Sequence, residues 1–203
     1  MTPTFTVLIG SAGRATLRRT LDSIAKQERI AGDQCIVVFD AFERQAAHLD
    51  TLCDVVASYG PGFIARTYDA GYHFYGVEQI NHALSSEPIT GSHIFTLGDD
   101  DVFVDGAYAS LRAICAQDPT RAVLYRFLAP WKEVLWDRPE FRMSRISGCC
   151  IAAPKAAVGL MPTQTTWDDG RPFVEHDYFW MKDVLAKTPP PVWLDQLLVV
   201  ARP

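Results

Sequence analysis

The sequence lacks the marks of several protein classes. No apolar run approaches the ~18 residues that a membrane span requires, and the opening MTPTFTVLIGSAGR has no basic segment of the kind that begins a signal peptide. We therefore expect neither a membrane span nor a secretory leader. The chain carries a net charge of −5, whereas proteins that bind nucleic acid over a whole surface are usually basic.

Cysteine is too sparse and too irregularly spaced for a zinc site or a disulfide framework. The chain has five cysteines, none of them in a CxxC pair, and Cys149 and Cys150 are adjacent. We expect buried free thiols in a reducing compartment, which predicts a cytoplasmic protein.

The order of apolar segments predicts one α/β domain. FTVLIG (5–10) and QCIVVFDAF (34–42) are typical of strands, and the amphipathic segment 14–27 between them is typical of a helix, so together they form a parallel βαβ unit. Further strands are expected at 54–60, 93–101, 121–130, 148–154 and 191–202, helices at 76–86, 105–117 and 175–187, and irregular segments at 61–75 and 131–145. The prediction is a mostly parallel central sheet flanked by helices, parallel in its first half and mixed in its second.

Three acidic residues, Asp99 to Asp101, follow the apolar run HIFTLG. Asp40 ends another predicted strand, and the loop GSAGR follows the first one. In an open α/β sheet, ligands gather beyond the carboxyl ends of the strands, so these segments should converge on one crevice. A divalent cation between the carboxylates would offset their repulsion, and Mg²⁺ or Mn²⁺ suits oxygen ligands and a diphosphate.

Four segments in this order resemble the landmarks of family 2-type glycosyltransferases with the GT-A fold. They are TVLIGSAGRATLRRTLDSIAKQ, CIVVFD, FTLGDDDVFVDGAYASL and FVEHDYFWMKDVL. The resemblance covers about residues 5 to 185. It implies a single GT-A (Rossmann-like) domain over 1–203, with a nucleotide-sugar-binding half at 1–105 and an acceptor-binding half at 106–203.

The resemblance also assigns roles to residues. It implies a nucleotide-sugar donor, for which UDP-sugars are the first expectation, and a Mn²⁺ or Mg²⁺ ion. It also implies inversion of configuration at the anomeric carbon of the transferred sugar. The implied donor-binding residues are Gly10, Ser11, Arg14, Asp40, Asp99 and Asp100. The implied metal ligands are Asp99, Asp101 and His176, of which His176 could instead touch the diphosphate. Asp177 is the implied catalytic base, with Glu175 as the competing choice.

The resemblance places the acceptor side just before SGCC, at residues 121–145, which hold six basic and three acidic residues with Trp131, Trp136 and Phe141 among them. The candidate contacts are Trp131, Trp136 and Arg145. Tryptophan rings stack on sugar rings and so suit a saccharide acceptor. Basic residues among aromatics equally suit a DNA strand with a hydroxymethylated base, whose phosphates would pair with arginines while a base stacks on a ring. Two other functions stay open: a nucleotidyltransferase, and a non-catalytic module that binds nucleotide sugars.

Overall fold

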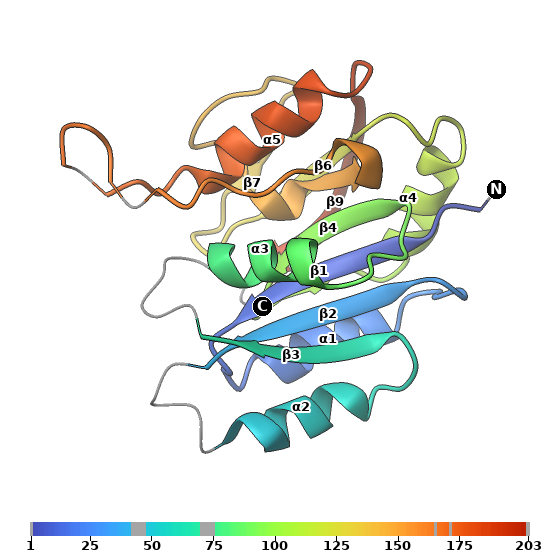
Figure 1. Ribbon diagram of the computed structural model, residues 1–203. Coiled ribbons are helices and arrows are strands. Elements are labelled where there is room, and N and C mark those ends of the chain that lie inside the picture. Colours follow the sequence, from blue (N-terminus) through green and yellow to red (C-terminus); the bar gives the residue numbers. More distant parts are fainter. Residues whose placement is uncertain (1, 42–47, 70–75, 165, 171, 202–203) are drawn as a thin grey trace.

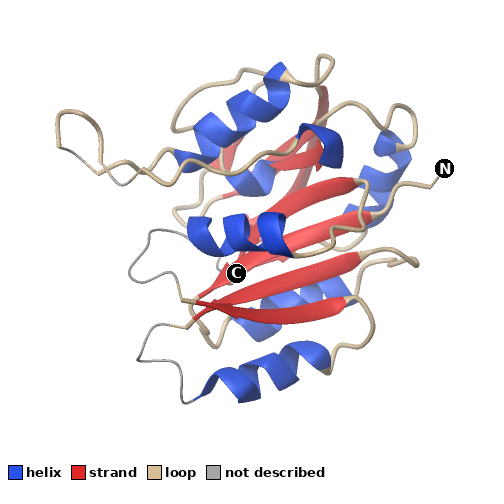
Figure 2. Cartoon of the chain, viewed as in Figure 1, coloured by secondary structure: helices blue, strands red, loops and turns tan. Residues whose placement is uncertain are grey.

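The computed structural model describes residues 2–41, 48–69, 76–164, 166–170 and 172–201. Within these residues nine strands form one sheet, in the order β3-β2-β1-β4-β8-β6-β9-β5, with β7 paired to β6 (Figure 1). Helices cover both faces of this sheet (Figure 2). The predicted α/β class and single central sheet are confirmed.

The first half of the sheet is parallel. β1 runs between β2 and β4 and pairs with both in parallel, and β3 pairs with β2 in the same direction. All four strands therefore end at one edge, on the left of Figure 1. The strands of this half are β1 (Phe5–Ser11), β2 (Gln34–Asp40), β3 (Phe63–Tyr68) and β4 (His93–Gly98).

The second half is mixed, as predicted. β8 pairs antiparallel with both β4 and β6, β6 runs parallel to β9, and β9 is antiparallel to β5. These strands are β5 (Asp101–Phe103), β6 (Val123–Leu128), β7 (Val134–Leu135), β8 (Ile151–Pro154) and β9 (Val192–Ala201). The end of the expected donor half thus pairs with the last strand of the chain.

The helices place their apolar positions on the sheet. In Figure 1, α3 lies in front of β1 and α1 lies behind β2. The helices are α1 (Leu17–Ala25), α2 (Leu49–Ala57), α3 (Val77–Ser86), α4 (Ala107–Cys115) and α5 (His176–Ala186), with 3-10 turns at η2 (Gly148–Cys150) and η3 (Lys155–Ala157).

Two predicted elements after β2 are wrong. The segment expected as a strand at 54–60 contains the end of α2, because Leu49, Leu52, Cys53 and Val56 repeat at helical spacing and lie against the core. The segment expected as a loop at 61–75 contains β3 instead. β3 is an edge strand whose weak apolar pattern hid it; residues 70–75 lie outside the described part of the chain.

The strand expected at 148–154 begins only at Ile151. Its first three residues form the 3-10 turn η2, which starts after Ser147, whose hydroxyl accepts the N–H of Cys149. A serine at this position favours a turn over a ladder because its side chain bonds the local backbone.

No helix in the described residues is long and apolar enough to cross a membrane. All five cysteines are free thiols, as expected.

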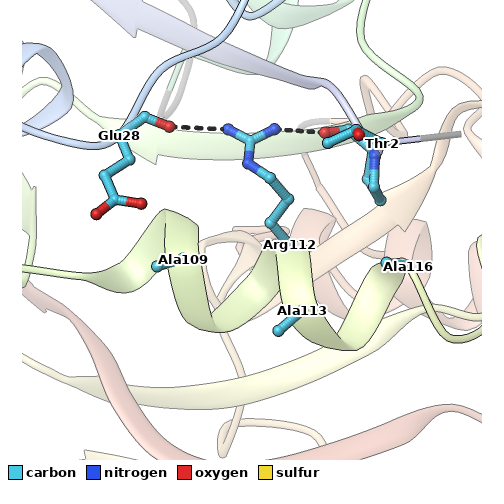
Figure 3. A pocket seen from close by; sticks show the side chains of 7 residues that line it. Thr2, Glu28, Ala109, Arg112, Ala113 and Ala116 are labelled. Atoms are coloured by element: carbon cyan, nitrogen blue, oxygen red, sulfur yellow. Dashed lines mark hydrogen bonds between the residues drawn. The ribbon is translucent and has the colours of Figure 1, made fainter.

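A buried ion pair ties the opposite edge of the sheet together. The Arg112 guanidinium donates to Asp33 Oδ2 at 2.7 Å and also to the carbonyls of Pro3 and Glu28. Asp33 Oδ1 further accepts the N–H of Phe5 at 2.8 Å. Arg112 lines a cavity of about 570 Å³ at this edge, among small side chains of α4 (Figure 3). Because its donors are already engaged, we assign this cavity a place in the scaffold and not in the site.

We expect Asp33→Ala to lower the free energy of unfolding by about 3–5 kcal/mol, the cost typical of removing one partner of a buried pair. Arg112, which is partly buried, would then lack its carboxylate, and the buried N–H of Phe5 would lose its acceptor. Urea denaturation measures the change. Asp54→Ala, an exposed aspartate on α2, is the control and should change stability by less than about 0.5 kcal/mol.

Candidate functional site

The ends of β1 and β4 meet at one carboxylate. Ser11 Oγ donates to Asp99 Oδ2 at 2.9 Å, and the N–H of Ala12 donates to the same oxygen at 3.1 Å. Ser11 Oγ also accepts the N–H of Gly13 at 3.0 Å, which closes the loop after β1. The GSAGR loop and the acidic run, distant in the sequence, therefore lie together as predicted.

Arg14 places a positive charge between two of the three aspartates. Its NH1 nitrogen lies 3.3 Å from Asp99 Oδ1 and 3.0 Å from Asp100 Oδ2. The Asp99 side chain is buried, whereas the Arg14 side chain is 53% exposed. The two carboxylates thus face one cationic position at the edge of the sheet.

Asp101 turns away from Arg14 toward the second half of the molecule. Its Oδ2 accepts the N–H of Gly98 at 3.1 Å and the thiol of Cys149 at 3.2 Å. Burial, with the charges of Asp101 and Asp177 nearby, raises the pKa of Cys149 well above its usual value, so this thiol stays protonated and donates.

Asp177 lies in the first turn of α5, beside η2, the 3-10 turn that contains Cys149. The N–H of Gly148 donates to Asp177 Oδ2 at 2.7 Å, and Ser147 Oγ lies 3.5 Å from that oxygen. A Cβ on Gly148 would lie 3.0 Å from Asp177 Oδ1 and 2.6 Å from Thr96 Oγ1, so only glycine allows this approach. Desolvation raises the pKa of Asp177, although the N–H of Gly148 partly offsets it.

The neighbours of Asp177 have other contacts. Glu175 Oε2 accepts the N–H of Val174 at 3.0 Å and the indole N–H of Trp167 at 3.2 Å. His176 is buried, with Nδ1 2.7 Å from the carbonyl oxygen of Pro162. His176 and Glu175 therefore contact the segment before α5, whereas Asp177 contacts Gly148.

Gly10 and Asp40 lie at the same edge. A Cβ on Gly10 would lie 2.7 Å from the carbonyl oxygen of Gly76, so Gly10 allows the start of α3 to approach β1 closely. Asp40 ends β2 opposite Tyr68 of β3, a residue that the sequence analysis did not single out.

The predicted acceptor segment is organised around Glu133. Its carboxylate accepts the indole N–H of Trp131 at 2.9 Å and also pairs with Arg145, which lies 3.2 Å from Asp137 as well. Trp131 is 65% exposed. An acidic residue thus joins two of the three predicted acceptor contacts.

The third predicted contact, Trp136, is buried. Its ring packs against Trp193 and Phe141 at centroid distances of 5.0 and 5.9 Å, and its backbone φ is 58°. A positive φ is unusual for so large a residue and marks a tight turn. In this structure Trp136 supports the segment that presents Trp131.

No group of three or more His, Cys, Asp and Glu side chains in the described residues is arranged to hold a metal. The observed fit is smaller: Asp99 and Asp100 hold a guanidinium nitrogen between their oxygens, a position that a divalent cation could also take. Two carboxylates leave coordination positions open for phosphate oxygens.

Sequence reasoning missed the turn that joins the acidic residues. Gly148 contacts Asp177 and Cys149 contacts Asp101, and the sequence analysis gives neither residue a role in the site. The sequence signal is the pair Ser147–Gly148, a turn signature at the start of the apolar run GCCIAAP.

The sequence matches no protein-family model and no curated protein. Solved structures do match its fold. Residues 1–349 of TarS from S. aureus give a TM-score of 0.71 at 13% identity, over 98% of this chain and 60% of that one. The same TarS fragment in complex with UDP-GlcNAc gives 0.69 at 13% identity, over 98% and 58%. The mannosyltransferase PcManGT from Pyrobaculum calidifontis, in complex with GDP-Man and Mn²⁺, gives 0.67 at 17% identity, over 100% and 57%.

These similarities establish the fold. The chain has the GT-A glycosyltransferase fold that the sequence resemblance implied. It spans 57 to 60% of the length of these three solved chains.

We expect Asp177→Asn to stabilise the protein at pH 7 by about 0.5–2 kcal/mol, the range of single stabilising substitutions. Because the folded state raises the pKa of this carboxyl, its ionised form disfavours folding at neutral pH, and asparagine removes that charge while still accepting from Gly148. The gain should shrink as the pH falls toward the ordinary aspartate value and wild type becomes protonated. Thermal unfolding from pH 7 to 4 measures it, and an equal gain at every pH would contradict it. Asp54→Asn is the control.

Proposed function

We propose that this chain is a metal-dependent glycosyltransferase that moves a sugar from a nucleotide-sugar donor to an acceptor hydroxyl, with inversion. One observation carries the proposal: the turn η2 contacts both the acidic run, through Cys149, and the candidate base Asp177. In this GT-A fold, one turn therefore contacts both a carboxylate of the proposed donor site, Asp101, and the proposed base, Asp177. The nucleotide sugars bound to TarS and PcManGT support this donor class.

On the donor side, Asp99 and Asp100 are the residues best placed to hold Mn²⁺ or Mg²⁺, with Asp101 as a further candidate ligand. When bound, such an ion supplies charge to offset that of the departing diphosphate. The loop from Ser11 to Arg14 would approach the phosphates, and Asp40 at the end of β2 would contact the nucleotide base. UDP-sugars and GDP-sugars are the donors to test first. The free thiols favour a cytoplasmic location for the protein.

On the acceptor side, Asp177 would take the proton of the attacking hydroxyl. The N–H of Gly148 donates to Oδ2 and fixes the carboxylate. Its raised pKa makes it a stronger base than an exposed aspartate. Glu175 is less suited because Trp167 and Val174 both donate to its Oε2.

The product separates this proposal from the alternatives. A glycosyltransferase releases a nucleoside diphosphate, a nucleotidyltransferase releases pyrophosphate, and a binding module releases neither. Mass spectrometry of the small products distinguishes the three, with UDP-GlcNAc or GDP-Man as the substrate in one incubation and a nucleoside triphosphate with a sugar 1-phosphate in another.

We expect Asp100→Asn to abolish the Mn²⁺-dependent stabilisation by the donor, while Asp177→Asn keeps it. Donor at 100 times its dissociation constant adds about 2.7 kcal/mol, a clear thermal shift. Asp177→Asn should instead lower transfer about 10²- to 10⁴-fold, the usual contribution of a general base. Asp105→Asn, an exposed neighbour of the acidic run, controls for charge, and Glu175→Gln tests the competing base. Full transfer by Asp177→Asn would refute the assignment of the base.

The acceptor remains one of two classes, a saccharide or a hydroxymethylated DNA base. The exposed Trp131 offers a ring to either. Arg145 pairs with Glu133 and Asp137, and Arg126 pairs with Asp195 at 2.7 Å, so part of the basic charge in this segment is already neutralised. Lys132, Arg138 and Arg142 are exposed.

We expect Trp131→Ala to raise the acceptor KM about 5- to 100-fold, since stacking on an aromatic ring contributes about 1–3 kcal/mol. Trp131→Phe should keep most of the affinity, and donor binding should not change. Assays with oligosaccharides and with hydroxymethylated DNA identify the class. A DNA acceptor would show a KM that rises steeply with salt, whereas a neutral saccharide would not.

A further inference from the structure

The side chain of Arg14 occupies the position where the proposed function calls for a divalent cation. Its NH1 nitrogen lies within 3.3 Å of one oxygen each of Asp99 and Asp100. Two carboxylates that face one position repel each other unless a cation lies between them. Arg14 supplies that cation from within the chain.

The loop that carries Arg14 is fixed independently of this contact. Ser11 and Ala12 donate to Asp99, and Gly13 donates to Ser11, so the backbone before Arg14 is held by hydrogen bonds of its own. The Arg14 carbonyl accepts the N–H of Leu17 at the start of α1. The long, half-exposed side chain can therefore move while the loop stays in place.

We propose that Arg14 is a resident counter-ion which the divalent cation displaces, and that the released guanidinium then pairs with the donor diphosphate. This inference rests on the proposed function. A guanidinium suits both partners, because its N–H groups match carboxylate and phosphate oxygens alike.

The exchange couples the metal to the nucleotide. A metal ion that binds alone must displace Arg14 from both carboxylates and leaves the guanidinium without an anion. A metal ion that arrives with a nucleoside diphosphate provides that anion. Each ligand should therefore strengthen the binding of the other, and the coupling must be equal in both directions.

The test is Mn²⁺ binding to the whole chain, measured by electron paramagnetic resonance and calorimetry, with and without UDP or GDP. In Arg14→Gln, the Kd for Mn²⁺ alone should fall about two- to fivefold, as expected for the loss of an exposed ion pair. The Kd for the nucleoside diphosphate in the presence of Mn²⁺ should rise, so the coupling becomes smaller. Arg14→Lys keeps a charge and should stay close to wild type.

Arg18→Gln is the matched control, because it removes an exposed arginine of α1 four residues after Arg14. It should leave both constants unchanged. Because the Arg14 side chain is half exposed, Arg14→Gln should fold, and a thermal melt checks this.

The outcomes separate the inference from the proposed function. If Mn²⁺ binding depends on the nucleotide but Arg14→Gln has the wild-type Kd for Mn²⁺ alone, the counter-ion role is overturned. The proposal of a glycosyltransferase then still stands. Equal changes in Arg14→Gln and Arg18→Gln would reduce the effect to general charge and also overturn the counter-ion role. Wild-type protein that binds neither Mn²⁺ nor a nucleotide would overturn both proposals.

Discussion

The hydrogen bond from Ser11 to Asp99 is the contact on which the site depends. It joins the ends of β1 and β4, two parallel strands that pair along six positions from Phe5 to Gly10. Because the strands are in register, the loop after β1 and the acidic run after β4 must come out of the sheet side by side. The position of Asp99 then sets where Asp100 and Arg14 can meet. A shift of one residue in this register would turn the side chains of the shifted strand to the opposite face of the sheet.

A second constraint comes from the turn before β8. Within three residues, the chain donates to Asp177 through the N–H of Gly148 and to Asp101 through the thiol of Cys149. Both donors are neutral, so they orient the carboxylates without cancelling their charge. The carboxylate of Asp177 is therefore held in place but remains costly to ionise, as its raised pKa indicates. A carboxylate that is held in place and has a raised pKa is a stronger base than an exposed one, and it accepts a proton more readily.

The sequence predicted the parts of this molecule that follow from strong periodicity. The parallel strands β1, β2 and β4, the helices at 76–86 and 175–187, and the meeting of the GSAGR loop with the acidic run all follow from apolar patterns and from the rule for strand ends. The errors fall where the pattern is weak or broken: α2, whose apolar repeat begins before residue 54, the half-exposed edge strand β3, and η2, where Ser147 bonds the local backbone just before an apolar run. The partners of Asp101, Trp131 and Asp177 could not be predicted, because each depends on a contact between segments far apart in the chain or on a turn with unusual φ.

The short strand β8 has a consequence for how the molecule opens. It pairs with β4 at two positions, Ala153 and Pro154, and the N–H of Lys155 adds one bond to the carbonyl of Ser92. Regions of a protein differ in the free energy of local opening, and segments held by few contacts open more readily than core strands. The turn η2 directly precedes this seam between β4 and β8. Because η2 contacts both Asp101 and Asp177, a small shift along this seam would move those two carboxylates together relative to the end of β1.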